Sequence, residues 1–401
     1  MVRTDVVACE RLMQGQIGQR TRALLFGASC VAWRPSCRQL SFREESVRLV
    51  DLIPVTIDGQ RIEVPEGTSV LEAAELIGID VPRLCHDPVL GAVGTCRLCV
   101  VEIDGMRNLR SSCTTKVTPE MMVRTKSPRV VESRRTVLEL LLSDHPADCL
   151  TCEKMGNCKL AEYAYDYGVR KGLSFAGEEH RYELDDTNPF IVRDPNKCIL
   201  CGKCVRACQE ITGKNVLGFA FRGFDTKAAP WGDTSYVESD CIFCGNCVAV
   251  CPTGALTEKG MQGQGRAWEM EKVRTTCSFC GVGCTVDLNV KDGKVVGVTS
   301  TDGTVNDQAM CVKGRFGWDY INSERRLTKP LIKREGRFEE ASWDEALDLV
   351  ASRLTDLRDR YGPKAFGALS SARTTNETNY LMQKFARGVM GTNSIDHCAR
   401  T

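Results

Sequence analysis

Two cysteine runs with identical spacing decide what kind of protein this sequence encodes. The first reads CILCGKCVRAC over residues 198–208, and the second reads CIFCGNCVAVCP over residues 241–252. Each run has the spacing C-x2-C-x2-C-x3-C, and proline follows the second run at Pro252. Cysteines this close together converge on one iron–sulfur cluster, so the repeat predicts two [4Fe–4S] clusters.

The repeat resembles the bacterial ferredoxin signature, in which the fourth cysteine of each run ligates the other cluster. This resemblance implies two crossed ligand sets. The first expected set is Cys198, Cys201, Cys204 and Cys251. The second expected set is Cys241, Cys244, Cys247 and Cys208.

The composition of the chain indicates metal binding and not disulfides. The 401 residues carry a net charge of +1, with 23 cysteines and only 4 histidines. Disulfide scaffolds are short and secreted, whereas cysteines three residues apart are well placed to hold one cluster. We therefore expect a reducing, cytoplasmic location. The balanced charge gives no reason to expect nucleic acid as a partner. The sequence contains no run of about 18 apolar residues, so no transmembrane segment is predicted.

The first 50 residues stand apart because they contain none of the grouped cysteines. The stretch ALLFGASCVAW (residues 23–33) resembles the apolar part of a signal peptide, but it lies far from the N-terminus and lacks a clean cleavage site. We expect residues 1–50 to be a disordered leader or a wrongly assigned gene start. Cys9, Cys30 and Cys37 are then free thiols without a role.

A [2Fe–2S] site is predicted next. IPVTIDGQRIEVPEG alternates apolar residues around Asp58-Gly59, a strong hairpin signal, and TSVLEAAELIG has helical spacing with Thr68 as the expected N-cap. Four cysteines follow with the spacing C-x10-C-x2-C-x13-C, namely Cys85, Cys96, Cys99 and Cys113. Four thiolates presented by a hairpin, a helix and a glycine-bearing loop suit a [2Fe–2S] centre. The alternative is a zinc knuckle, but its usual two C-x2-C pairs are absent.

A third group combines one histidine with three cysteines. The helical segment SRRTVLELLLSDHP, with its leucines clustered as on a buried face, leads into HPADCLTCEKMGNC. No fourth cysteine is near, and a single imidazole can complete the ligand set of a [4Fe–4S] cluster while changing its charge and potential. The expected ligands are His145, Cys149, Cys152 and Cys158.

The fourth group has the spacing C-x2-C-x3-C-x26-C, with CSFCGVGC followed later by CVKGRFGWDYI. Its expected [4Fe–4S] ligands are Cys277, Cys280, Cys284 and Cys311. This arrangement resembles the start of molybdenum or tungsten bis-pterin oxidoreductases, and most closely formate dehydrogenases. In that family Lys313 corresponds to the lysine between the cluster and the pterin. The alternative for Lys313 is an ordinary surface lysine.

The last 70 or so residues resemble the first α/β segment of the molybdopterin-binding domain in formate dehydrogenases. WDEALDLVASRLTDLRDRYGP is expected to be a helix, AFGALSS a short buried strand, and TNETNYLMQKFARGVMG a helix capped by Thr375 or Asn376. In that family a stretch like the terminal IDHCART precedes a metal-binding cysteine or selenocysteine and then a histidine. The resemblance implies that the chain is cut just before a selenocysteine.

Over residues 53–401 the chain resembles the catalytic subunit of NAD-linked or electron-bifurcating formate dehydrogenases, with cluster domains like those of complex I and [FeFe]-hydrogenases. The implied fold is a multidomain α+β chain. It comprises a β-grasp [2Fe–2S] ferredoxin, a helical one-His/three-Cys [4Fe–4S] segment, a two-cluster [4Fe–4S] ferredoxin, a pterin-oxidoreductase [4Fe–4S] domain and a truncated α/β domain. After the leader, the expected boundaries are residues 51–128, 129–180, 181–262, 270–326 and 327–401.

The same resemblance implies the chemistry. The cofactors would be one [2Fe–2S] and four [4Fe–4S] clusters, with molybdenum or tungsten bis(pterin guanine dinucleotide) in the full-length protein. Formate would be oxidised to CO2, and electrons would pass from the Cys277 group through the ferredoxin pair to the His145 cluster and the [2Fe–2S] centre. The expected partner is a flavin- and NAD-binding diaphorase-type subunit. The 401-residue chain itself is expected to relay electrons without oxidising formate.

Three alternatives remain open at this point. A complex I large iron–sulfur subunit shares the first three cluster domains and often keeps the fourth cluster beside a degenerate pterin domain. An [FeFe]-hydrogenase shares the N-terminal clusters, but nothing after Cys251 resembles its catalytic motifs. A stand-alone multi-cluster electron carrier is the non-enzymatic alternative, and the resemblance of the C-terminal part to a substrate domain argues against it.

The expectation about selenocysteine is tested on the gene itself. We predict that the codon after Thr401 is UGA, that the next codon encodes histidine, and that the frame then stays open for several hundred codons. A selenolate is a softer and more acidic ligand than a thiolate, which suits a molybdenum or tungsten centre. Genomic sequencing showing UAA or UAG at that position would contradict the expectation.

Overall fold

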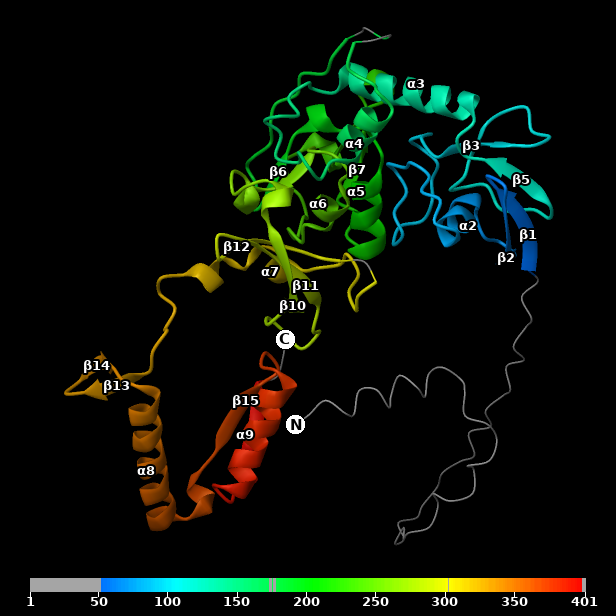
Figure 1. Ribbon diagram of the computed structural model, residues 1–401. Helices are drawn as coiled ribbons and strands as arrows, with labels where there is room; N and C mark the ends of the chain where they lie inside the picture. The colour runs from blue at the N-terminus through cyan, green and yellow to red at the C-terminus, as the bar shows by residue number, and fades with distance from the viewer. Residues whose placement is uncertain (1–51, 173–174, 176–177, 302, 399–401) are drawn as a thin grey trace, which may run out of the picture. The chain divides into compact units, whose positions relative to one another are not determined.

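The computed structural model describes residues 52–172, 175, 178–301 and 303–398 (Figure 1). The expected leader at residues 1–50, with its three cysteines, lies outside the described residues, as do the last three residues of IDHCART. All described elements belong to the second of two units, residues 50–401. They form a mixed α+β structure, as predicted. Among them, no helix is long and apolar enough to cross a membrane.

The first part is a five-stranded sheet covered by one helix. Its strands are β1 (Leu52–Ile57), β2 (Gln60–Pro65), β3 (Val100–Ile103), β4 (Arg110–Ser111) and β5 (Met121–Arg124). Their order is β2-β1-β5-β3-β4; only β1 and β5 run parallel. The hairpin turn falls at Asp58-Gly59 as predicted, because both residues adopt the positive φ that such a turn requires, 48° and 83°. Helix α2 (Val70–Leu76) contributes its apolar side to the same core as the strands.

The N-cap of α2 is Ser69, so the expectation of Thr68 was wrong. Ser69 Oγ accepts a hydrogen bond from Glu72 N at 3.2 Å, and the Glu72 carboxylate accepts one from Ser69 N at 2.6 Å. This reciprocal arrangement is a capping box. Thr68 instead donates its hydroxyl to Pro65 O at 2.7 Å. Of two neighbouring hydroxyl residues, the one followed by glutamate at the third helical position forms the cap.

Two helices follow the sheet. They are α3 (Pro128–Asp144) and α4 (Lys159–Asp166). Helix α3 begins before the expected segment, since Ser127 Oγ accepts a hydrogen bond from Val130 N and proline suits the first turn. Three of its four leucines, Leu138, Leu141 and Leu142, pack in one buried cluster as predicted, whereas Leu140 is 50% exposed. Leu138 lies in one apolar cluster with residues of α4 and of the loops that carry the first cysteines.

The two cysteine runs lie in a region of short strands and short helices. These are β6 (Ile191–Arg193), α5 (Lys203–Arg206), β7 (Leu217–Ala220), β8 (Lys227–Pro230), α6 (Asn246–Val250) and β9 (Leu256–Glu258). Strands β6 and β9 pair antiparallel, and β7 and β8 form a separate hairpin. A π-helical turn, Ala207–Ile211, continues α5. The core joins Ile191, Leu217, Tyr236 and Leu256 with the buried thiols.

The fourth cysteine group lies beside an antiparallel three-stranded sheet. Its elements are β10 (Glu271–Thr276), β11 (Thr285–Lys291), β12 (Lys294–Thr299) and the short helix α7 (Val312–Phe316). Val286 of β11, Val298 of β12 and Met310 form its small core. Cys277 and Trp318 pack against this core.

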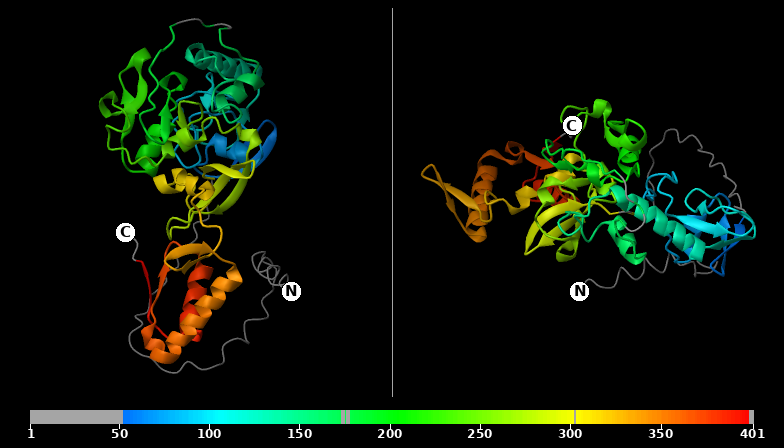
Figure 2. Two further views of the ribbon diagram at one scale, coloured as in Figure 1. Left: turned by 90° about the vertical axis from the view of Figure 1, so that its left-hand side faces the viewer. Right: turned by 90° about the horizontal axis from the view of Figure 1, so that it is seen from above.

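The last part contains the predicted helix, strand and helix. Its elements are β13 (Leu331–Arg334), β14 (Arg337–Glu340), α8 (Trp343–Tyr361), β15 (Ala368–Ser371), α9 (Asn376–Gly388) and β16 (Ile395–Cys398). Strands β15 and β16 pair in parallel, and α9 lies alongside β15 (Figures 1 and 2). Thr375 is the N-cap of α9. The expected burial of the strand was wrong, since Leu369 is 82% exposed on a sheet of only two strands.

Candidate iron–sulfur centres

The nineteen cysteines of the four predicted groups are all free thiols, so no disulfide occupies any of them. Within the part of the chain that the structure describes, no three His, Cys, Asp or Glu side chains are gathered tightly enough to hold a single metal ion. The thiols of one group instead line the same cavity or lie on the same short loop. Those loops determine which thiols lie near one another.

The sequence repeat produces the same local structure twice. Leu200 and Phe243 occupy equivalent positions in the two runs, and both adopt positive φ, 51° and 55°. This conformation turns the backbone N–H of Leu200 towards Cys198 Sγ and that of Phe243 towards Cys241 Sγ, both at 3.4 Å. Such N–H donors stabilise negative charge on sulfur and raise the potential of a bound cluster. Each run therefore presents its first sulfur already hydrogen-bonded.

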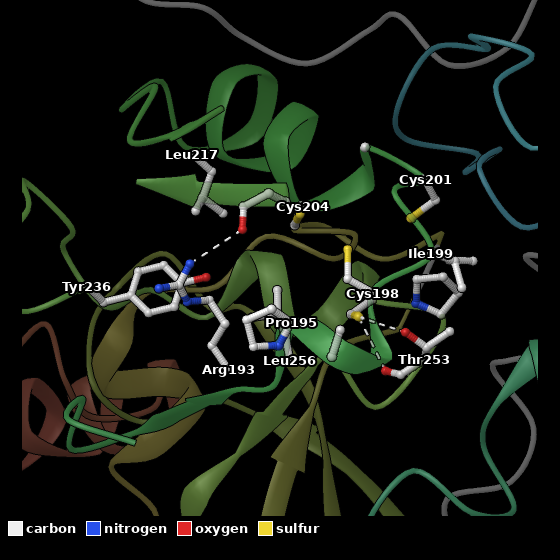
Figure 3. A pocket seen from close by; sticks show the side chains of 15 residues that line it. Arg193, Pro195, Cys198, Ile199, Cys201, Cys204, Leu217, Tyr236, Thr253 and Leu256 are labelled. Atoms are coloured by element: carbon white, nitrogen blue, oxygen red, sulfur yellow. Dashed lines mark hydrogen bonds between the residues drawn. The ribbon is translucent and has the colours of Figure 1, made fainter. Parts of the chain in front are cut away.

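Two cavities lie between the runs, and each takes its fourth thiol from the other run. The thiols lining the first cavity are Cys198, Cys201, Cys204 and Cys251. Figure 3 shows this cavity with Cys198, Cys201 and Cys204 among the residues that line it. The thiols lining the second cavity are Cys241, Cys244, Cys247 and Cys208. Leu217 and Tyr236 line both cavities and so separate them.

Burial makes several of these thiols, Cys201, Cys204 and Cys247 among them, reluctant to ionise. It raises the pKa of Cys201 to about 12, and it raises the pKa values of Cys204 and Cys247 well above the ordinary thiol range. A metal binds the thiolate and releases the proton, so cluster formation would relieve this cost. Four buried or half-buried thiols around one apolar cavity therefore fit a [4Fe–4S] cluster.

The four cysteines of the predicted [2Fe–2S] site, which we call the first cysteine group, form two thiol pairs. Cys99 Sγ lies 3.3 Å from Cys113 Sγ, and Cys96 N donates to Cys85 Sγ at 3.4 Å. A thiol–thiol hydrogen bond within each pair lowers the pKa values of Cys96 and Cys99 and raises those of Cys85 and Cys113. Two adjacent pairs of thiols fit the two irons of a [2Fe–2S] cluster.

The structure buries His145 in a form suited to metal ligation. It follows the last residue of α3, its side chain is 8% exposed, and its Nδ1 has no hydrogen-bond partner. Burial lowers the pKa of His145, so the imidazole is neutral, as a ligand must be. Lys171 Nζ donates to His145 O at 2.9 Å and fixes the backbone. A buried ring nitrogen without a partner fits the predicted role.

The fourth group gathers around α7 and the start of β11. Cys277 N donates to Cys284 O at 2.8 Å, and burial raises the pKa values of both thiols. A Cβ placed on Gly314 would lie 3.5 Å from Cys277 Sγ and 4.0 Å from Cys311 Sγ, so both sulfurs face the same turn of α7. Lys313, on the same helix, is exposed.

Basic side chains of α5 contact the loop of the first cysteine group, a feature that the motifs did not predict. Lys203 Nζ forms a 2.8 Å ion pair with Asp87, whose side chain is 3% exposed. Arg206 donates to Cys85 O at 2.5 Å and also to Gly91 O. The two predicted cluster sites are therefore joined through one helix.

A second junction links the His145 group to the first cysteine run. Lys197, next to Cys198, forms a 2.9 Å ion pair with Asp148, next to Cys149. A Cβ on Gly254 would lie 2.7 Å from Cys152 Sγ, so only glycine permits this approach. The only sequence signal for these contacts is the position of charged residues directly beside cysteines.

Comparison with protein families assigns a description to each part. Residues 51–128 match a 2Fe-2S iron-sulfur cluster binding domain, and residues 134–172 match the NADH-ubiquinone oxidoreductase-G iron-sulfur binding region. Residues 188–257 match the ferredoxin-like domain of NADH-quinone oxidoreductase subunit 3. Residues 270–323 match the molybdopterin oxidoreductase Fe4S4 domain, and residues 326–401 match molybdopterin oxidoreductase. The first match supports the [2Fe–2S] prediction over the zinc knuckle.

Three curated relatives show the range of functions. The chain is 38% identical over 352 residues to a subunit of NADH-quinone oxidoreductase from Rhizobium meliloti, covering 87% of this chain and 40% of the relative. The same values hold for NADPH-Fe(3+) oxidoreductase subunit alpha of Geobacter sulfurreducens. This chain is 35% identical over 386 residues to a putative formate dehydrogenase of Staphylococcus aureus, covering 86% of this chain and 39% of that relative. The chain thus spans about two fifths of these relatives.

These matches describe a chain of α+β architecture built from iron–sulfur domains and molybdopterin oxidoreductase domains. Its relatives include both a subunit of NADH-quinone oxidoreductase and putative formate dehydrogenases.

The crossed ligand sets are tested by removing one fourth cysteine. We predict that C208S damages the cluster held by Cys241, Cys244 and Cys247 and leaves the cluster of its own run intact, because Cys208 lines the other cavity. Electron paramagnetic resonance (EPR) and Mössbauer spectra of the iron-loaded variant would distinguish the two. C398S, outside all four groups, is the matched control. Selective damage to the Cys198 cluster would contradict the crossing.

Proposed function

We propose that this chain is the electron-relay portion of a molybdenum- or tungsten-dependent formate dehydrogenase. In the full-length protein, formate would be oxidised to CO2, and the electrons would leave through one [2Fe–2S] and four [4Fe–4S] clusters. The bound pterin–metal group would supply the two-electron chemistry, which the clusters then divide into single-electron steps. A diaphorase-type subunit carrying flavin and NAD is the proposed partner.

The contact between cluster-binding loops is the observation that carries the relay. The first cysteine run contacts the loop of the first group through Lys203 and Asp87, and it contacts the His145 group through Lys197 and Asp148. The second run contacts the fourth group, because Arg315 of α7 donates to Cys244 O at 3.2 Å. A local reaction needs one centre, whereas a connected series of sites suits electron transport.

Each predicted ligand keeps a defined role in this proposal. The nineteen grouped cysteines and His145 hold the clusters, with the fourth cysteines of the two runs exchanged. Lys313 lies between the fourth cluster and the pterin, a position consistent with its exposure beside Cys311.

A large iron–sulfur subunit of an NADH-quinone oxidoreductase is the second candidate function. It is favoured by the 38% identity to the Rhizobium meliloti protein and by the family description of residues 134–172. Both candidates use the chain as a relay. They differ in whether the pterin domain of the full-length protein reacts with formate.

Iron content and formate oxidation test the two levels of the proposal separately. Anaerobically reconstituted chain should bind about eighteen irons, from one [2Fe–2S] and four [4Fe–4S] clusters. In the full-length protein, formate should reduce a viologen dye. Well-folded chain with about ten irons or fewer would contradict the five clusters. Full iron content without formate-dependent reduction in metal-loaded full-length protein would favour the NADH-quinone oxidoreductase alternative.

A further inference from the structure

Arg315 is a buried positive charge at the junction between the second cysteine run and the fourth group. Its side chain is 3% exposed and belongs to α7, close to Cys311. Its Nε donates to Cys244 O at 3.2 Å, and its Nη2 donates to Gln308 O at 3.2 Å and to Asn246 Oδ1 at 3.4 Å. One guanidinium therefore joins the loops that carry thiols of two different predicted clusters.

The side chain of Arg315 packs directly against Gly245. Gly245 has a φ of 74°, and a Cβ there would lie 2.3 Å from Arg315 Cδ and 2.6 Å from Phe316 Cζ. Phe316 stacks on Phe190, with ring centroids 5.0 Å apart and an interplanar angle of 8°. Glycine between Cys244 and Asn246 thus admits the arginine side chain against the cluster loop.

Glu258 is the strongest opposite charge that acts on Arg315. Burial lowers the pKa of Arg315, but an arginine stays protonated in proteins. The groups that interact with its charge are Glu258 and the thiols of Cys247, Cys244 and Cys311. Burial raises the pKa of Glu258 to about 7, so this carboxyl compensates the charge only in part at neutral pH.

We propose that Arg315 is an electrostatic positioning residue shared by two clusters, the one held by Cys241, Cys244, Cys247 and Cys208 and the one held by Cys277, Cys280, Cys284 and Cys311. Each reduction adds one negative charge to a cluster, and a fixed positive charge in a low-dielectric region stabilises the reduced form. One guanidinium raises both potentials together. The difference in potential between the two clusters is then little changed.

This inference rests on the proposed relay, and redox titration of the full iron-loaded chain by EPR tests it. Replacing Arg315 by Gln should lower the potentials of these two clusters selectively. At a fixed ambient potential, the ratio of reduced to oxidised cluster should fall at least tenfold, which is about 59 mV for a one-electron couple. R315K keeps the charge and should stay within about threefold of wild type. R325Q removes an exposed arginine near α7 and should shift neither cluster.

Two results would overturn the inference. One is an R315Q protein whose five potentials are unchanged or shifted equally; the other is an R315K shift as large as that of R315Q. If R315Q does not retain the two clusters, E258Q is measured at pH 8, where Glu258 is ionised. Removing this negative charge should raise the same two potentials. An E258Q protein with unshifted potentials would refute the role of Arg315. Wild-type chain without these clusters would instead contradict the proposed function.

Discussion

The need to bring four metal ligands together from distant points of the chain is the constraint on which this structure depends. The two cavities between the cysteine runs each require a thiol from the other run, so neither half of the region can form its site alone. Burial raises the pKa values of Cys201 and Cys204, so ionisation of these thiols is costly without a metal. The local fold is correspondingly poor in regular structure, with short helices and two-stranded pairs around the sites. Cluster binding and folding are therefore expected to be coupled.

Basic side chains extend this constraint from single sites to the whole series. Lys203 and Arg206 reach the loop of the first group, Lys197 reaches the His145 group, and Arg315 joins the second run to the fourth group. All four lie close in sequence to predicted cluster ligands. Lys203 and Lys197 are themselves paired with carboxylates, Asp87 and Asp148. These basic residues thus hold the loops together across the junctions.

Spacing and turn chemistry predicted what is local, and burial and long-range contacts decided the rest. The Asp58-Gly59 hairpin and the two C-terminal helices followed from residue type and periodicity. The cap of α2 was missed by one residue, because the deciding partner was Glu72 and not the hydroxyl itself. Arg206 and Cys85 are 121 residues apart, and no pattern in the sequence pairs them. The ligand role of His145 gained support from its burial and its unpartnered Nδ1, which spacing alone does not reveal.

The EPR spectrum of the iron-loaded, fully reduced chain tests most directly whether these sites form one relay. Paramagnetic clusters that lie next to one another broaden and split each other's signals. Because their loops are in direct contact, the ferredoxin pair and the fourth cluster should broaden and split one another's signals. On partial reduction, the narrow signals of single clusters should return. Five narrow, independent signals in the fully reduced protein would contradict a connected relay.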